Sequence, residues 1–430
     1  MSIWKTAANS LITLEKAFFV VYMSLCSLCP LWLNKVFTLW LIMENNHKSA
    51  MRFIVLLGIV SLLADITYES ARSLAGPYLA ILGATGAVVG FTAGLGELLG
   101  YGLRFFSGLL SDKTRRYWMI TIIGYTVNLL AVPLLALAGH WPLAAALMIT
   151  ERIGKSIRTP ARDVMLSHAA ATVGRGWGFA IHEAMDQIGA MTGPVIVMLV
   201  LAINGSYRYA FAVLAIPAFL AITVLVIARF IYPHPQKLET ETPAQPDGKF
   251  PAVFWLYIIA VGLVAAGFAD YPLIAYHIKQ HSIFADKWIP LLYAFAMGVD
   301  AIAALLFGKW YDKAGMLSLA AAVALSSFFA LFAFASGTAL IIGGIVLWGI
   351  GMGAQESIIR AVVADIVPTQ RRGTGYGIFN AGYGICWFIG SALMGVLYDI
   401  SLPALIVFSI LSQLASLPLL IFVRKKLVKS

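Results

Sequence analysis

Apolar stretches of about 20 residues recur along this sequence, and this pattern limits the folds that the chain can adopt. Hydrophobic residues make up 60% of the 430 residues and charged residues only 12%, whereas soluble domains keep about a quarter of their residues charged. Lipid is therefore the expected surrounding, and in lipid the backbone hydrogen bonds have to close within helices. The sequence predicts an all-α polytopic membrane protein with twelve transmembrane helices, at residues 53–79, 86–108, 117–139, 141–160, 177–203, 208–231, 252–277, 288–308, 316–336, 338–359, 374–398 and 402–423.

A polar, proline-rich segment divides the twelve stretches into two sets of six. It runs from Tyr232 to Phe250 and reads YPHPQKLETETPAQPDGKF, a composition typical of a linker. We therefore expect a six-helix bundle at residues 51–231, a cytoplasmic linker at 232–250, a second six-helix bundle at 251–423 and a basic cytoplasmic tail at 424–430.

Lysine and arginine residues are distributed unevenly between the two sides of the predicted bundles. If the first helix starts in the cytoplasm, they gather in the cytoplasmic loops, with about three (Arg208, Lys279 and Lys287) on the other side. This bias predicts a multi-pass protein of the bacterial inner membrane with both termini in the cytoplasm. It also accounts for the net charge of +10 without nucleic acid as a partner. The three cysteines give neither a disulfide framework nor a zinc-ligand spacing.

The first fifty residues fit neither bundle and are treated as an amino-terminal extension, residues 1–50. Residues 17–33 are apolar enough for a short crossing, but Pro30, Asn34 and Lys35 interrupt its carboxyl-terminal side, and no small-residue cleavage site marks a signal peptide. A thirteenth crossing would place the amino terminus outside. We favour the alternative that translation begins at Met43 or Met51, which leaves a short basic cytoplasmic lead-in.

The two predicted bundles carry related sequences. Residues 108–113 (GLLSDK) follow the second helix and 308–313 (GKWYDK) follow the eighth, while 175–179 (RGWGF) match 372–376 (RGTGY). Gly193 matches Gly390 at the same offset as the second pair. The glycine and aspartate of the loop suit a latch that forms in one state only, because glycine allows close helix approach and aspartate pairs with cations or helix amino termini. The latch residues are Gly108, Asp112, Lys113, Arg115 and Arg116, with Gly308, Asp312 and Lys313 in the second copy.

From Arg52 to its end the chain resembles the major facilitator superfamily (MFS). Residues 108–116 resemble the loop signature of that family, except that Arg115 stands where the pattern has glycine; the second copy keeps Gly315 there. Residues 189–194 (GAMTGP) resemble part of the antiporter motif, although Val197 and Met198 replace its following glycines. Residues 152–163 (RIGKSIRTPARD) resemble a branch of bacterial permeases. The resemblance implies two pseudo-symmetric six-helix bundles with a site at their interface, the arrangement of alternating-access carriers in this family.

Ionisable side chains inside the predicted helices are the best markers of function, because each costs about 2.5–3.5 kcal/mol at the bilayer centre. Asp65, Glu69 and Arg72 lie at i, i+4 and i+7 on one face of the first helix. Asp65 and Glu69 are our first candidates to carry a coupling proton and Glu97 the second, while a fixed Glu69–Arg72 ion pair is the alternative. The residues assigned to proton coupling or the substrate cavity are Asp65, Tyr68, Glu69, Arg72, Glu97, Glu151, Asp270, Tyr271 and Asp300.

Further polar residues are assigned to gating. On the fifth helix, His182, Glu183 and Asp186 lie within about one turn. An ion-pair network is the first interpretation there, substrate contact the second and a metal site a distant third, because no second histidine completes a zinc motif. Adjacent residues point differently, so Arg152 is expected to turn away from Glu151 toward the latch. The gating residues outside the latch are Arg152, Arg158, Arg162, Asp163, His182, Glu183, Asp186, Gly189, Gly193, Pro194, Gln355 and Glu356.

These features predict a secondary active transporter that moves a small molecule by alternating access, without a cofactor. Proton-coupled export is favoured by residues 189–194, and proton-coupled uptake is the alternative. A membrane enzyme would need a nucleophile–base set or a metal motif, and a sensor would need a soluble output domain; the sequence contains no such feature. The expected partners are the substrate, protons and the lipid bilayer. A monomer is expected because glycine-rich helices let one chain enclose its own pathway.

Overall fold

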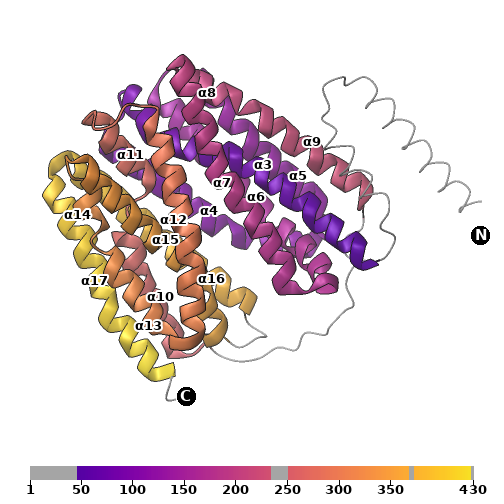
Figure 1. Ribbon diagram of the computed structural model, residues 1–430. Coiled ribbons are helices and arrows are strands. Elements are labelled where there is room, and N and C mark those ends of the chain that lie inside the picture. The colour runs from indigo at the N-terminus through magenta and orange to yellow at the C-terminus, as the bar shows by residue number, and fades with distance from the viewer. Residues whose placement is uncertain (1–45, 234–249, 368–371, 428–430) are drawn as a thin grey trace, which may run out of the picture.

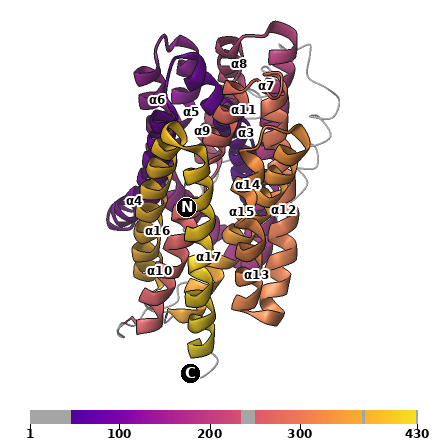
Figure 2. The ribbon, with the colours of Figure 1, turned by 90° about the vertical axis from the view of Figure 1, so that its left-hand side faces the viewer.

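A computed structural model describes residues 46–233, 250–367 and 372–427. The apolar stretch at 17–33, the Met43 start and most of the linker lie outside these residues. Within the described residues every regular element is a helix. The chain turns at one end of the bundle near Gly83, Gly205 and Ser282, and at the other end near Arg115, Gly174 and Gly315. We call these the Gly83 end and the Arg115 end; they lie at the top and bottom of Figures 1 and 2.

The first half of the chain forms six spans, and the sixth is made of two helices. Their bounds are α3 (Asn46–Ile81), α4 (Gly86–Thr114), α5 (Tyr117–Leu134), α6 (Trp141–Val173), α7 (Arg175–Asn204), α8 (Tyr207–Val213) and α9 (Ala215–Ile231). The predicted starts and ends lie within these helices or a few residues beyond them, and several helices run further at the Arg115 end. That difference is expected, because the prediction followed apolar residues, whereas helices continue past the lipid.

The second half repeats this order of six spans. Its helices are α10 (Ala252–Gly267), α11 (Tyr271–Gln280), α12 (Trp288–Ala314), α13 (Met316–Ser326), α14 (Phe329–Ala333), α15 (Thr338–Ile366), α16 (Arg372–Ile400) and α17 (Leu402–Leu427). Eleven helices among the described residues are long and apolar enough to cross a membrane. Helix α6 is not among them because it carries charged residues, yet it packs against α4 and α5 as the twelfth span. The predicted twelve-helix fold is confirmed.

Equivalent helices pack alike in the two halves. Helix α7 lies on α3 as α16 lies on α10, and α6 lies on α4 as α15 lies on α12. A Cβ on Gly193 would lie 2.5 Å from the backbone oxygen of Ile66, and one on Gly390 would lie 2.0 Å from that of Ala266. The matched glycines therefore make the same close helix contact in both halves, as the repeat predicted.

One predicted helix is broken. Residues 252–277 were expected to form a single span, but the structure has α10 and α11 with the non-helical residues Phe268, Ala269 and Asp270 between them. Other side chains satisfy the carbonyl groups freed by the break: Ser409 Oγ donates to the Gly267 oxygen at 2.6 Å, and Trp348 Nε1 to the Ala269 oxygen at 2.9 Å. These partners come from α17 and α15, so the sequence around the break gives no sign of them.

The halves are joined at the Gly83 end. The Asp399 carboxylate at the end of α16 accepts hydrogen bonds from the backbone nitrogens of Gly86 (2.8 Å) and Ala87 (2.7 Å) at the start of α4. Tyr276 of α11 donates to the Ala84 oxygen at 3.0 Å. Figure 2 shows α16 beside α4. By contrast, α6 and α15 make at most a minor contact with each other over their described residues. This conformation is therefore closed at the Gly83 end.

The loop between α4 and α5 holds a strained residue. Arg115, at the position where the second copy has Gly315, has a φ of 51°, and Gly315 has a φ of 57°. A side chain in this left-handed region costs about 1–2 kcal/mol, which glycine avoids. Arginine at position 115, where the family pattern has glycine, therefore strains the backbone.

We expect Arg115→Gly to stabilise the protein. The release of this strain should raise the free energy of unfolding by about 1 kcal/mol, after the greater flexibility of glycine in the unfolded chain is subtracted. The melting temperature in detergent measures the change. Arg116→Gly is the matched control, since Arg116 has a φ of −91°, and it should not stabilise. Equal effects of the two substitutions would contradict the explanation.

Candidate functional site

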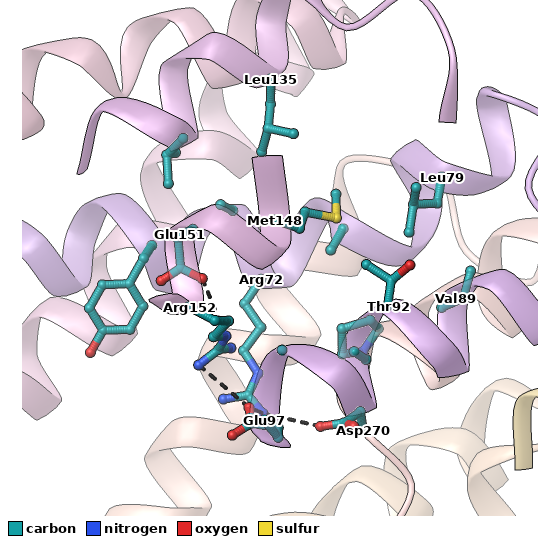
Figure 3. A pocket seen from close by; sticks show the side chains of 17 residues that line it. Arg72, Leu79, Val89, Thr92, Glu97, Leu135, Met148, Glu151, Arg152 and Asp270 are labelled. Atoms are coloured by element: carbon teal, nitrogen blue, oxygen red, sulfur yellow. Dashed lines mark hydrogen bonds and ion pairs between the residues drawn. The ribbon is translucent and has the colours of Figure 1, made fainter. Parts of the chain in front are cut away.

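A cavity of about 50 Å³, which has room for about four water molecules, lies mainly within the first half of the protein. Helices α3, α4, α5 and α6 line most of it, and the break before α11 closes one side. Its wall is apolar toward Leu79, Val89 and Leu135 and charged at the opposite end, where the labelled acids and arginines converge (Figure 3). An organic substrate would need the halves to separate.

Five charged residues form a continuous chain of alternating sign across this cavity (Figure 3). The three acids are buried, and the two arginines are largely so. Arg72 lies 3.4 Å from both Asp270 and Glu97, Arg152 lies 3.4 Å from Glu97, and Arg152 lies 3.2 Å from Glu151. Buried charges are tolerated when they are paired in this way. Asp270 belongs to the second half of the chain and the other four to the first, so the chain of ion pairs crosses the interface between the halves.

Both ends of the ion-pair chain are fixed by hydrogen bonds. Trp387 Nε1 (2.9 Å) and Ser391 Oγ (2.8 Å) donate to Asp270 Oδ2. At the other end, Asn128 Nδ2 donates to Glu151 Oε1 at 2.7 Å. Each terminal carboxylate is therefore held by its own half of the protein.

One prediction about these residues is wrong, and the alternative of a fixed Glu69–Arg72 ion pair is not what the structure shows. Arg152 was expected to turn away from Glu151 toward the latch, but the two side chains pair with each other inside the cavity. Glu69 and Arg72 were considered as a fixed ion pair, but among the described residues Arg72 pairs with Glu97 and Asp270. Helix spacing shows which residues share a face, whereas the neighbouring helices decide the partner of each charge.

A second set of contacts surrounds Glu69, one turn toward the Arg115 end. Tyr293 of α12 donates a short hydrogen bond to Glu69 Oε2, and Lys155 Nζ lies 3.9 Å from Glu69 Oε1. Lys155 also lies 3.9 Å above the ring of Tyr68, a cation–π distance. Glu69 thus connects α3 with α6 of its own half and with α12 of the other half.

The next layer toward the Arg115 end contains Asp65. Its side chain is 5% exposed and its Oδ1 has no hydrogen-bond partner among the described residues. The guanidinium of Arg158, 1% exposed, lies 4.2 Å from the ring centroid of Tyr125. Arg162 lies 2.8 Å from Asp163, and His182 lies 3.4 Å from Asp186. Acids and bases of three helices, α3, α6 and α7, therefore meet in one layer.

The glycines at 189 and 193 create the contact between α3 and α7. A Cβ on Gly189 would lie 2.8 Å from Asp65 Cβ, and one on Gly193 would lie 2.6 Å from Ser70 Oγ. Pro194 follows within α7 without ending the helix. These residues thus bring α7 against the face of α3 that carries Asp65.

In the second half, the predicted residues other than Asp270 lie outside the ion-pair chain. Tyr271 donates to the Ile289 oxygen at 2.8 Å and packs 4.5 Å from Tyr293, away from the cavity. Asp300 is buried, and its Oδ1 has no hydrogen-bond partner among the described residues. Gln355 accepts a hydrogen bond from Tyr383 at 3.1 Å and, with Glu356, lines a separate cavity of about 30 Å³ between α4, α15 and α16. Glu183, next to His182 on α7, is exposed.

The latch residues Asp112, Lys113 and Arg116 are exposed at the Arg115 end, and Asp312 and Lys313 are exposed in the second copy. No ion pair within the described residues includes Asp112 or Asp312. A Cβ on Gly108 or Gly308 would meet its nearest neighbour at 3.7 Å, an ordinary contact. The close approach expected of these glycines is therefore not made in this conformation. The latch therefore stays a prediction for the opposite conformation of the transporter.

Sequence reasoning missed several partners of the charged residues. Tyr293, Trp387 and Ser391 come from the second half, and their role depends on packing. Two others had a signal: Asn128 is a polar residue in the middle of an apolar stretch, and Lys155 lies one turn from Arg152 on a span. A buried amide or lysine in a spanning helix needs a partner.

Two equivalent six-helix halves, with a chain of ion pairs that runs from a charged cavity of the first half to Asp270 of the second, define a membrane transporter. The family model described as "Major Facilitator Superfamily" matches residues 57–391 and 272–429. The chain belongs to the major facilitator superfamily.

Relatives of known sequence and structure agree with this assignment. An uncharacterised protein of Mycobacterium tuberculosis, Rv2265, is 44% identical over 383 residues, which cover 87% of this chain and 94% of that protein. An uncharacterised MFS-type transporter of Methanocaldococcus jannaschii is 24% identical over 83% of this chain and 91% of its own length. The crystal structure of a mutant of the nucleoside transporter NupG has a TM-score of 0.69 at 13% identity, covering 85% of this chain and 99% of that one. This last likeness concerns the fold alone.

Proposed function

We propose that this protein is a proton-coupled exporter, an antiporter that moves a small organic molecule across the bacterial inner membrane by alternating access. The observation that carries the proposal is the buried chain of ion pairs that crosses the interface of the two halves. We further propose that a single chain encloses the pathway, with the Arg115 end and both termini in the cytoplasm, because basic residues gather there.

The ion-pair chain suits two halves that separate and rejoin. If Asp270 moves away from Arg72, Arg72 keeps Glu97 and Asp270 keeps Trp387 and Ser391. If Tyr293 moves away from Glu69, Glu69 keeps Lys155. An uncompensated buried charge is strongly destabilising. Because each group retains a partner in its own half, the contact can break at low cost, as alternating access requires.

Asp65 is the proposed proton carrier. Burial of a carboxyl oxygen without a partner favours the protonated form over the charged form, and Oδ1 of Asp65 is such an oxygen. Asp65 lies two turns from Arg72 on α3, so loss of its proton would change the charge balance of the layer beside the ion-pair chain. The likeness of residues 189–194 to the antiporter motif supports export, and Gly189 packs directly on Asp65.

We expect Asp65→Asn to abolish coupling. A deletion strain grown on a panel of compounds supplies a transported compound, and proteoliposomes with an imposed proton gradient then measure its transport. Gradient-driven transport should fall at least about tenfold, equivalent to at least about 1.4 kcal/mol, while exchange without a gradient persists. Asp286→Asn is the control, because the Lys279–Asp286 pair lies outside the cavity. Undiminished coupling in Asp65→Asn would contradict the proposal, and substrate movement in the same direction as the protons would identify uptake.

A further inference from the structure

We propose that Asp186 and His182 of α7 form a proton relay between Asp65 and the aqueous surface at the Arg115 end. This inference rests on the proposed function, since it takes Asp65 as the coupling site. It assigns to the two residues a role in proton transfer, beyond a gate of fixed ion pairs.

The first step of the relay follows from the contact of α3 with α7. A Cβ on Gly189 would lie 2.8 Å from Asp65 Cβ, so the backbone of α7 passes directly beside Asp65. Asp186 lies three residues earlier on α7, on the same face and one turn closer to the Arg115 end. Two carboxyl groups on the packed faces of α3 and α7 are cheaper to hold in a buried layer when one of them carries a proton.

The second step lies within α7. Nδ1 of His182 is 3.4 Å from Oδ2 of Asp186, at the i, i+4 spacing of one helical turn. The His182 side chain is only 3% exposed. Asp65, Asp186 and His182 therefore descend toward the Arg115 end in steps of about one turn, and each can accept and release a proton.

Each of the three residues also has a buried atom that lacks a partner among the described residues. These atoms are Asp65 Oδ1, Asp186 Oδ1 and His182 Nε2. Buried polar atoms are nearly always hydrogen-bonded, if not to protein then to water. Three such atoms in sequence along one helix interface suit a chain of bridging water molecules.

The surrounding charges fit a proton relay better than a permanent ion pair at Asp186. Arg162 of α6 lies 2.8 Å from Asp163 but 4.0 Å from Asp186, so Asp163 is its principal partner. Two further cations of α6 lie in the same region: Arg158 is 5.6 Å and Lys155 3.9 Å from the ring centroid of Tyr68. From α12, Asp300 faces this part of α7, and Glu183 is the remaining acid on α7 itself. Asp186 is thus held beside cations without being locked to one.

The proton transfers balance without a further reactant. Protonated Asp65 passes its proton through water to the Asp186 carboxylate, and Asp186 passes it to Nδ1 of neutral His182. The imidazolium then releases the proton from Nε2 to water at the Arg115 end. The ring regains its starting tautomer by proton exchange with water. Release at this end matches a conformation closed at the Gly83 end.

The test uses the full-length protein in proteoliposomes, with the compound identified by the growth panel. In His182→Ala, gradient-driven transport should fall at least tenfold, while exchange without a gradient stays within twofold. Imidazole added on the Arg115 side should restore at least a third of the lost rate, because a small base can occupy the space left by the removed ring. His182→Gln and Asp186→Asn should slow coupled transport in the same way. His168→Gln on α6 is the matched histidine control and should keep the wild-type rate.

The outcomes separate this inference from the function on which it rests. Retained coupling in Asp65→Asn would overturn the proposed function itself. Lost coupling in Asp65→Asn together with unchanged coupling in His182→Ala and His182→Gln would overturn the relay alone. An equal loss of coupled transport and exchange, without rescue by imidazole, would also overturn it and identify a structural gate. If His182→Ala does not elute as a single folded species in detergent, His182→Gln and Asp186→Asn decide the question by the same two rates.

Discussion

Replacement of Arg72 by alanine is expected to lower the free energy of unfolding by about 3 kcal/mol, because it removes a cation and leaves the three carboxylates of the ion-pair chain with Arg152 alone. Arg72 is the cation between Asp270 and Glu97, at 3.4 Å from each. Its loss also removes the Arg72–Asp270 ion pair between the two halves. We therefore expect transport to fall by about two orders of magnitude, equivalent to about 3 kcal/mol. Melting in detergent and transport in proteoliposomes measure the two effects.

A double substitution tests whether the lost stability comes from the missing charge of Arg72 or from the missing volume of its side chain. Arg72→Ala/Asp270→Asn removes both members of the inter-half pair, so it should recover part of the lost stability but none of the transport. Arg229→Ala, at an exposed position on α9, is the control and should change stability by less than about 0.5 kcal/mol. A single mutant as stable as the wild type would show that the carboxylates of Glu97 and Asp270 do not depend on Arg72.

Gly390→Ala is expected to disrupt the second half of the protein. The added Cβ would lie 2.0 Å from the Ala266 oxygen and 2.4 Å from its Cα, and backbone atoms cannot move aside as a flexible side chain would. Forced overpacking costs about 1–3 kcal/mol, and a backbone clash belongs at the upper end of that range. Helix α16 must shift away from α10, and Ser391 and Trp387 would then lose their hydrogen bonds to Asp270.

The expected result is a lower melting temperature together with at least about tenfold slower transport, equivalent to about 1.4 kcal/mol. Gly343→Ala is the matched control, because Gly343 also lies within a spanning helix but has no atom within 4 Å of the added Cβ. It should leave stability unchanged or raise it by up to about 1 kcal/mol, since alanine is the better helix former. Similar losses in both variants would point to glycine flexibility and away from the contact with Ala266.

Some features of the candidate site were accessible from the sequence alone. Asp65, Glu69, Arg72, Glu97 and Glu151 stood out because an ionisable side chain within an apolar stretch is costly without a purpose. The four acids are buried, and the Arg72 side chain is 10% exposed. Arg152 was also recognised from the sequence, but the predicted direction of its side chain was wrong. Adjacent helical residues point about 100° apart, yet long side chains can still converge on one cavity.

The sequence by itself determined the class of protein, the number and positions of its spanning helices and the repeat of its two halves. These are local properties, because a bilayer imposes one helix length on every apolar stretch. Only the tertiary structure decided that Arg72 pairs with Asp270, 198 residues away, and that the seventh span breaks at Phe268–Asp270. Such pairings depend on which helix faces lie together, and the same spacing along one helix is compatible with several partners.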